Sequence, residues 1–228
     1  MIVPRPDRAV VVLGRLPRPG QVKTRLIPAL GEALATALYE AMLGEVLAQA
    51  EEAARRAEAT LYFACDTLGE PLHQARRYTK EAIILPQPTG DLAVRLLDAA
   101  RATQAEAVVL LGSDAPQLSA ERITEALVRL PAGGATVIPA VDGGYVALGM
   151  QGILQMLFHE IPWSTSAVLA TTLARAEAAQ VPILSLGPAI QDLDEPADLA
   201  AVLAALPATA RCRPLFEEAL LAFGADGV

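Results

Sequence analysis

The sequence AVVLLGSDAPQL, residues 107–118, indicates the fold of this chain. Five apolar residues, 107–111, run without interruption into Gly112, Ser113 and Asp114. A short apolar run that ends at glycine and polar residues is typical of a strand buried on both faces of a sheet. Asp114 then follows the carboxyl end of that strand, where open α/β sheets bind ligands. Two roles stay open for Asp114: it can cap a turn, or it can hold a divalent cation beside a phosphate.

Similar apolar runs recur along the chain and alternate with helical patterns. Residues 31–57 have the spacing of a long amphipathic helix, and Ser164 or Ser166 is expected to cap another helix that runs to residue 179. The alternation predicts a three-layer α/β/α sandwich with a mostly parallel sheet. The length suits one full-sized core, so we expect residues 1–228 to form a single domain. The further strand candidates are residues 9–13, 59–65, 81–85, 135–140 and 181–186.

Composition excludes several classes of protein. The net charge of -8 argues against general nucleic-acid binding. No run reaches about 18 apolar residues, so no membrane span is expected, and the first residues lack the order of a signal peptide. Cys65 and Cys212 are the only cysteines and form no spaced framework, which favours a reducing, cytoplasmic location. The two histidines, His73 and His159, lie far apart and do not indicate a zinc site.

Positive charge is concentrated near the N-terminus. Residues 1–30 hold six Arg or Lys side chains against the single acidic residue Asp7, so the rest of the chain is strongly acidic. The segment GRLPRPGQVKTRL, residues 14–26, contains prolines and a glycine that exclude regular structure. It includes Lys23, one of only two lysines in the chain. A basic loop of this kind can attract and bind an anionic ligand.

Polar clusters follow four of the predicted strands. They are residues 14–25, 113–114, 142–145 and 192–194, and in a parallel sheet such loops meet along one edge. A basic loop with two separate carboxylates suits a metal-bound diphosphate or triphosphate, because Mg²⁺ is held by one or two carboxylates, waters and phosphate oxygens. For residues 142–145, DGGY, an ordinary hairpin turn is the alternative. The glycine-rich dinucleotide fingerprint and the P-loop motif are both absent.

Several motifs resemble those of a known bacterial family. PRPGQVKTRL, residues 17–26, resembles the signature P-x-P-G-x-V-K-T-R-L of a family with the nucleotide-diphospho-sugar transferase fold, and GSDAPQL resembles its G-[ST]-D-x-P-x-L. DGGY, IPWSTSAV and DLDEPADL match its later motifs in order, and the resemblance covers about residues 9–205. Members of this family are usually labelled glycosyltransferases with the GT-A fold, and some are linked to arsenosugar biosynthesis.

The resemblance implies roles for individual residues. Asp114 and Asp194 would face a Mg²⁺ or Mn²⁺ ion, with Asp192 as the competitor of Asp194, and Asp114 would also bind the metal–nucleotide complex. Asp142 is the candidate general base by its position, so Asp142 and Asp114 are the candidate catalytic residues. The residues expected at the nucleotide and its phosphates are Arg15, Lys23, Thr24, Arg25, Ser113, Asp114, Gly143 and Gly144.

Three functions follow from these residues. The first is transfer of a sugar from a nucleotide-diphospho-sugar to a small acceptor. The second is nucleotidyl transfer, because KTRL before a long helix also resembles guanylyltransferases that join an NTP to a phosphorylated small molecule and release pyrophosphate. The third is a nucleotide-binding module without turnover. The expected partners are a nucleotide or nucleotide-sugar donor and a small-molecule acceptor, and the oligomeric state is left open.

Overall fold

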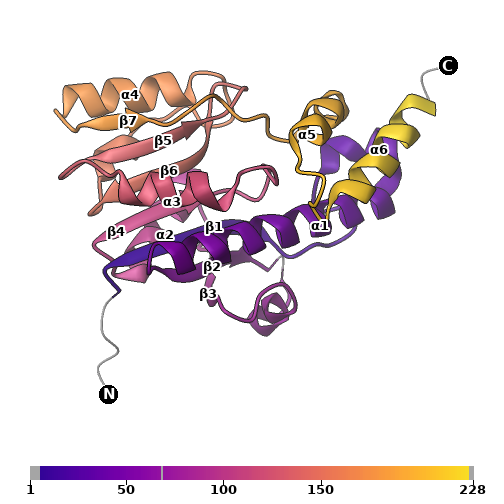
Figure 1. The fold of residues 1–228 in the computed structure, drawn as a ribbon, viewed down its shortest axis with the longest axis horizontal. Helices are drawn as coiled ribbons and strands as arrows, with labels where there is room; N and C mark the ends of the chain where they lie inside the picture. Colours follow the sequence, from indigo (N-terminus) through magenta and orange to yellow (C-terminus); the bar gives the residue numbers. More distant parts are fainter. Residues whose placement is uncertain (1–5, 68, 226–228) are drawn as a thin grey trace.

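A seven-stranded sheet forms the centre of the molecule (Figure 1). The computed structural model describes residues 6–67 and 69–225, and the strand order is β3-β2-β1-β4-β6-β5-β7. Strand β6 is antiparallel to β4 and β5, and the other neighbouring pairs are parallel. This confirms the mostly parallel sheet. The strands are β1 Arg8–Arg15, β2 Thr60–Asp66, β3 Ile83–Pro86, β4 Ala107–Leu111, β5 Ala135–Pro139, β6 Tyr145–Gln151 and β7 Ile183–Ser185.

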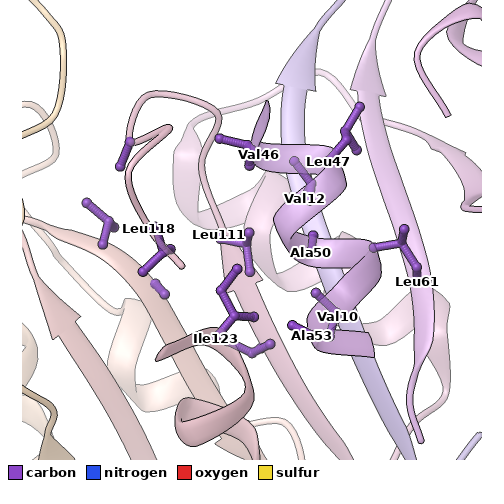
Figure 2. Packing of buried hydrophobic residues seen from close by; sticks show 14 of the residues in the cluster. Val10, Val12, Val46, Leu47, Ala50, Ala53, Leu61, Leu111, Leu118 and Ile123 are labelled. Carbon is purple, nitrogen blue, oxygen red and sulfur yellow. The ribbon is translucent and has the colours of Figure 1, made fainter. Parts of the chain in front are cut away.

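Helices cover both faces of this sheet and complete the predicted three layers. The side chains of β1 alternate, so that Val10 and Val12 pack with α1 and α3, while Val11 packs with α2 and α4 on the opposite face. Figure 2 shows the first of these cores, with Val46 and Leu47 on α1, which lies in front of the strands in this view. The helices are α1 Ile27–Arg56, α2 Leu92–Thr103, α3 Ala120–Val128, α4 Val168–Ala178, α5 Leu199–Ala205 and α6 Arg213–Ala225, with short 3-10 turns at Thr24–Leu26, Leu72–Arg77, Gln155–Phe158 and Pro196–Asp198.

Helix α1 serves two cores. Its second half lies on the sheet, and its first half packs Leu38 and Met42 against α5 and α6 (Figure 1). Gly31, with φ 74° and ψ 160°, interrupts the helical geometry near its start. By length and composition alone, Thr24–Arg56 is the one described stretch that could cross a membrane. A core helix meets the same criterion, and both Leu38 and Met42 are fully buried in this one.

The loops with polar clusters gather at one edge of the sheet. The strands β1, β4, β5 and β7 end at this edge, and β6 begins there because it forms a hairpin with β5. The turn of this hairpin contains Asp142, whose Oδ1 accepts the Gly144 N–H at 2.7 Å. The simple hairpin turn considered for DGGY is therefore present, and it lies at the edge where ligands bind in this class of fold.

One predicted helix cap is wrong. The residue before α4 is Ala167, and no side chain caps that helix. Ser164 instead takes a left-handed backbone conformation with φ 63°, and the Thr165 hydroxyl closes the local turn by donating to the Pro162 carbonyl at 2.7 Å. The predicted caps fail because the chain turns sharply here before the helix starts.

Leu193 anchors the loop that carries the DLD sequence. Its side chain is fully buried in the core formed with α1, α5 and α6, and its N–H donates to the Asp114 carbonyl at 3.0 Å. Its own carbonyl accepts the Lys23 ammonium. One buried residue therefore joins three of the four polar loops.

We expect Leu193→Ala to lower the free energy of unfolding by about 2–5 kcal/mol, because it leaves a cavity where a fully buried side chain was removed. Urea denaturation measures the change. Leu221→Ala, at a side chain that is 76% exposed on α6, is the matched control and should change stability by no more than about 0.5 kcal/mol. Equal losses for the two variants would show that Leu193 is not an anchor.

Candidate functional site

Six of the eight residues predicted at the nucleotide and its phosphates, all except Gly143 and Gly144, meet in one cleft at the sheet edge. This basic cleft has a volume of about 330 Å³ and lies where β1 and β4 end. Three cationic side chains and two carboxylates face it, together with polar and apolar groups of the loop after β1. Its lining residues are Arg15, Gln21, Val22, Lys23, Thr24, Arg25, Tyr39, Ser113, Asp114 and Asp194.

Lys23 lies at the centre of the negative charge in the basic cleft. Its Nζ is 2.6 Å from Asp114 Oδ1 and 3.6 Å from Asp194 Oδ1, and it also donates to the Leu193 carbonyl. The Lys23 side chain is only 6% exposed, and its backbone is left-handed with φ 45°. Such a backbone conformation is costly for a residue with a side chain. The contacts of the ammonium with Asp114, Asp194 and the Leu193 carbonyl offset this cost.

The oxygens around Lys23 have the chemistry of a divalent-cation site. Two carboxylate oxygens and one carbonyl oxygen converge on a single positive group, and these are the ligand types that Mg²⁺ prefers. Among residues 6–67 and 69–225, no three His, Cys, Asp or Glu side chains cluster as a complete metal site. The residues present therefore fit a metal that takes its remaining ligands from water and a bound phosphate.

Tyr39 is a residue of the site that the sequence analysis missed. Its buried hydroxyl accepts the Arg15 N–H at 2.9 Å and lies 3.2 Å from Ser113 Oγ. Burial, followed by the nearby Asp114 carboxylate, raises the pKa of this phenol far above its usual range. Neutral Tyr39 therefore joins α1 to the ends of β1 and β4 beneath the basic cleft. The sequence feature that could have indicated this role is the hydroxyl of Tyr39 among the apolar positions of a core helix.

A second cleft adjoins the basic cleft and shares Arg25 and Asp194 with it. This acidic cleft has a volume of about 530 Å³ and lies between the Asp142 turn, the loop before α4 and the loop after β7. Five carboxyl groups face it against one guanidinium. Its lining residues are Arg25, Asp142, Ser164, Thr165, Ser166, Gln191, Asp192, Asp194, Glu195 and Asp198.

The two acidic residues of the DLD sequence occupy different surroundings. Asp194 faces both clefts and lies near Lys23, whereas Asp192 lines the acidic cleft with Asp142. Burial raises the pKa of Asp192 to about 6, and the Asp142, Asp194 and Asp114 carboxylates add to this effect. In this arrangement Asp194 is better placed than Asp192 to face a cation beside Asp114. The assignment of these roles stays a prediction.

Asp198 shapes the loop between the clefts, and the sequence analysis did not single it out. Its carboxylate accepts the N–H groups of Asp194 and Glu195 at 3.0 and 2.8 Å, and the Gln191 side-chain amide at 3.0 Å. The order Glu195-Pro196 followed by Asp198 is that of a capping box, which is the signal that could have indicated this role.

Gly143 and Gly144 shape the turn and are not among the lining residues of either cleft. Gly143 has φ 90°, and a Cβ there would lie 2.2 Å from the Ser166 carbonyl oxygen. Both glycines therefore act through backbone geometry in this structure. Their predicted contact with a nucleotide stays a prediction.

A third cleft of about 280 Å³ extends from the basic cleft along the sheet edge, and shares Arg15, Ser113 and Asp114 with it. It is mainly apolar, with Leu13, Leu96 and Tyr145 in its wall, and Gln87 and Arg95 supply polar groups. The Gln87 amide is fixed because its Nε2 donates to the carbonyls of Gly14 and Ala64 at 2.9 and 2.7 Å.

Residues 47–165, just over half of the chain, match the model of a bacterial family described as "uncharacterized protein conserved in bacteria (DUF2064)". The chain belongs to this family. Comparison with curated proteins gave no match. The matched segment of this DUF2064 protein includes Asp114, Asp142 and Gly143, while Lys23 and Asp194 lie outside it.

Solved structures with the same fold include enzymes of nucleotide and sugar chemistry. A protein from Desulfovibrio desulfuricans G20, named as a candidate nucleotide-diphospho-sugar transferase, superposes with a TM-score of 0.84 at 24% identity, over 96% of this chain and 97% of its own. CMP:2-keto-3-deoxy-manno-octonic acid synthetase complexed with CTP gives a TM-score of 0.53 at 15% identity, over 86% and 96% of the two chains.

A protein of Mycobacterium tuberculosis H37Rv in complex with manganese also has this fold. It gives a TM-score of 0.53 at 18% identity, and covers 88% of this chain and 100% of its own. These likenesses confirm that the DUF2064 chain has the nucleotide-diphospho-sugar transferase fold predicted from its motifs.

We expect Lys23→Met to strengthen binding of Mn²⁺ alone by about tenfold or more, because the ammonium competes with a cation for the same carboxylates. The same change should weaken binding of a nucleoside diphosphate, since a positive group is lost from the phosphate cleft. Titration calorimetry measures both affinities. Lys80→Met removes the other lysine, which is exposed and outside the basic and acidic clefts, and should change neither. An unchanged Mn²⁺ affinity in Lys23→Met would exclude the competition.

We expect Tyr39→Phe to lower the free energy of unfolding by about 1–3 kcal/mol, because the Arg15 N–H loses its buried acceptor. Ser113→Ala keeps that acceptor and should cost less. Urea denaturation of the two variants compares these losses directly. A larger loss in Ser113→Ala would show that the Tyr39 hydroxyl does not hold the strand ends.

Proposed function

We propose that this protein is a metal-dependent glycosyltransferase that moves a sugar from a nucleotide-diphospho-sugar to a small acceptor. The observation that carries the proposal is the basic cleft, where Lys23 and two further cations adjoin a pair of carboxylates that converge on one positive group. A diphosphate with a bound cation needs both kinds of group within a few ångströms.

The donor is arranged along the three clefts. Its diphosphate lies in the basic cleft, where Arg15 and Arg25 bind phosphate oxygens, and its base lies in the apolar third cleft. With a divalent cation held by Asp114 and Asp194, the Lys23 ammonium would bind the phosphates instead of these two carboxylates. The sugar is assigned to the acidic cleft, since this cleft meets the basic cleft at Arg25 and Asp194, whereas the third cleft meets it at Arg15, Ser113 and Asp114.

A divalent cation held by Asp114 and Asp194 would stabilise negative charge on the departing diphosphate. The residues of the chain perform the remaining tasks. Lys23 and Arg25 hold the same leaving group by charge-assisted hydrogen bonds. Asp142, at the border of the acidic cleft, accepts the proton of the acceptor hydroxyl as general base.

The whole chain, residues 1–228, acts as one catalytic domain in this proposal. We place it in the cytoplasm, because Cys65 and Cys212 are buried free thiols with no disulfide between them. The fold likeness to proteins solved with CTP and with manganese supports use of a nucleotide and a divalent cation.

Nucleotidyl transfer is the second candidate, and one observation favours it. Three cationic side chains in the basic cleft suit a triphosphate better than a sugar diphosphate. In that reaction an NTP is attacked at its α-phosphorus by a phosphorylated acceptor, and pyrophosphate leaves. Glycosyl transfer is preferred here because the acidic cleft, on the acceptor side, would repel such an acceptor.

The product released decides between the two reactions. With Mg²⁺ or Mn²⁺, we expect the protein to release a nucleoside diphosphate from a sugar nucleotide, slowly in the absence of the true acceptor. Asp142→Asn should slow this release by about 10²–10⁴-fold, as expected for loss of a general base, and should leave donor affinity nearly unchanged. Chromatography of the nucleotides and calorimetry measure the two effects.

Pyrophosphate release from an NTP, with sugar nucleotides inert, would replace glycosyl transfer by nucleotidyl transfer. Tight binding of both nucleotide classes without turnover in the presence of varied acceptors would favour the non-catalytic binding module.

A further inference from the structure

The two adjoining clefts carry opposite charge. The basic cleft contains three cationic side chains and two carboxylates, and the acidic cleft contains five carboxyl groups with Arg25 as its one cation among the described lining residues. Arg25, which lines both clefts, has its Nη1 atom 3.8 Å from Oε1 of Glu195 in the acidic cleft. The charge therefore changes sign between two clefts that share Arg25 and Asp194.

The acidic cleft is a built cavity whose walls are fixed by close packing. On one side, the Gly143 turn lies so near Ser166 that a Cβ at position 143 would come within 2.2 Å of its carbonyl oxygen. The Gly143 carbonyl also accepts the Leu169 N–H at 2.9 Å. This contact joins the Asp142 turn to the first turn of α4, directly after the hydroxyl-bearing loop.

Asp198 fixes a second part of the cleft lining. Its carboxylate accepts the N–H groups of Asp194 and Glu195, which fixes where these two side chains start. These carboxylates and Asp142 line the same cavity of about 530 Å³. A volume of this size accommodates a sugar-sized acceptor.

We propose that the acidic cleft is the acceptor subsite, and that its charge selects an acceptor that carries hydroxyl groups and no anionic group. This inference rests on the proposed glycosyl transfer. Hydroxyl groups donate hydrogen bonds to carboxylates, whereas a phosphate or carboxylate in the same place meets like charge, which disfavours its binding. A divalent cation and the donor diphosphate largely neutralise each other in the basic cleft, so the sign of the acidic cleft persists when donor binds.

A thiol placed in the acidic cleft measures this charge without any turnover. In Ser166→Cys, an exposed side chain of the cleft wall becomes reactive, while the native Cys65 and Cys212 stay buried. A positively charged methanethiosulfonate, with a trimethylammonium group, is compared with a negatively charged one, with a sulfonate. The ratio of the two rates cancels differences in thiol ionisation and reports the local potential.

The control thiol is Ala170→Cys, which is exposed on α4, one turn further along and outside the lining of the acidic cleft. It experiences the same overall charge of the protein. We expect the ratio of cationic to anionic reagent to be about tenfold higher or more at position 166 than at position 170, as potentials of several kT imply. Asp142→Asn with Glu195→Gln, added to Ser166→Cys, should bring the ratio down to that of the control.

Equal ratios at the two positions, or a preference for the anionic reagent at position 166, would overturn the proposal. Thermal melting checks that each variant is folded, and Thr165→Cys, also exposed in the cleft wall, replaces Ser166→Cys if that variant does not fold.

An acceptor comparison separates this inference from the proposed function. With a sugar nucleotide that the protein turns over, glycerol should accelerate release of the nucleoside diphosphate, and glycerol 3-phosphate should not. Acceleration by the phosphate alone would overturn the acceptor class while leaving glycosyl transfer intact. If no sugar nucleotide is turned over, the proposed function fails and the acceptor assignment with it, and the thiol ratio still determines the charge of the cleft.

Discussion

The contact of the Lys23 ammonium with Asp114 and Asp194 is the interaction on which the candidate site depends. It joins the loop after β1 to the loops after β4 and β7, which are distant in the sequence. Without a positive group between them, two carboxylates directed at one point repel each other. The left-handed backbone of Lys23 adds strain that these contacts offset. The site is therefore organised around a cation even before any ligand binds.

The side chains of residues 192–194 point alternately to the acidic cleft and to the core, and this connects the carboxylates of the site to the core. Adjacent side chains of an extended segment point in opposite directions, and Leu193 is fully buried while Asp192 and Asp194 both line the acidic cleft. The hydrophobic contact of Leu193 with α1, α5 and α6 thus fixes the direction of two carboxylates. This explains why an additional small core lies beside the sheet, since it supports the loop rather than the sheet itself.

The sequence was sufficient to predict the layers, because the runs at residues 9–13 and 107–111 are apolar on every position and become strands buried on both faces. Strand β6, which contains Gly149, was not singled out, and only the hairpin alternative for residues 142–145 implied it. The structure gives the reason for that glycine: a Cβ there would lie 2.3 Å from Thr136 Oγ1 on the neighbouring strand. The role of Tyr39 was hidden for a similar reason, because its partner Ser113 is 74 residues away. Contacts of this kind depend on how strands pair, which local patterns do not specify.

The fold is compatible with both candidate reactions, whereas the charges of the two clefts help to distinguish them. Proteins with this fold include one named for nucleotide-diphospho-sugar transfer and one solved with CTP, so a likeness of backbone leaves both reactions open. The basic cleft also serves either reaction, because each leaves negative charge on phosphate. The reactions differ at the acceptor, which is an alcohol in one and an anion in the other. Glu195 and Asp198 resemble ordinary helix-start residues in the sequence, yet the fold places them in one cleft with Asp142. In the proposed function, these carboxylates are what would discriminate between the reactions, because their charge opposes an anionic acceptor.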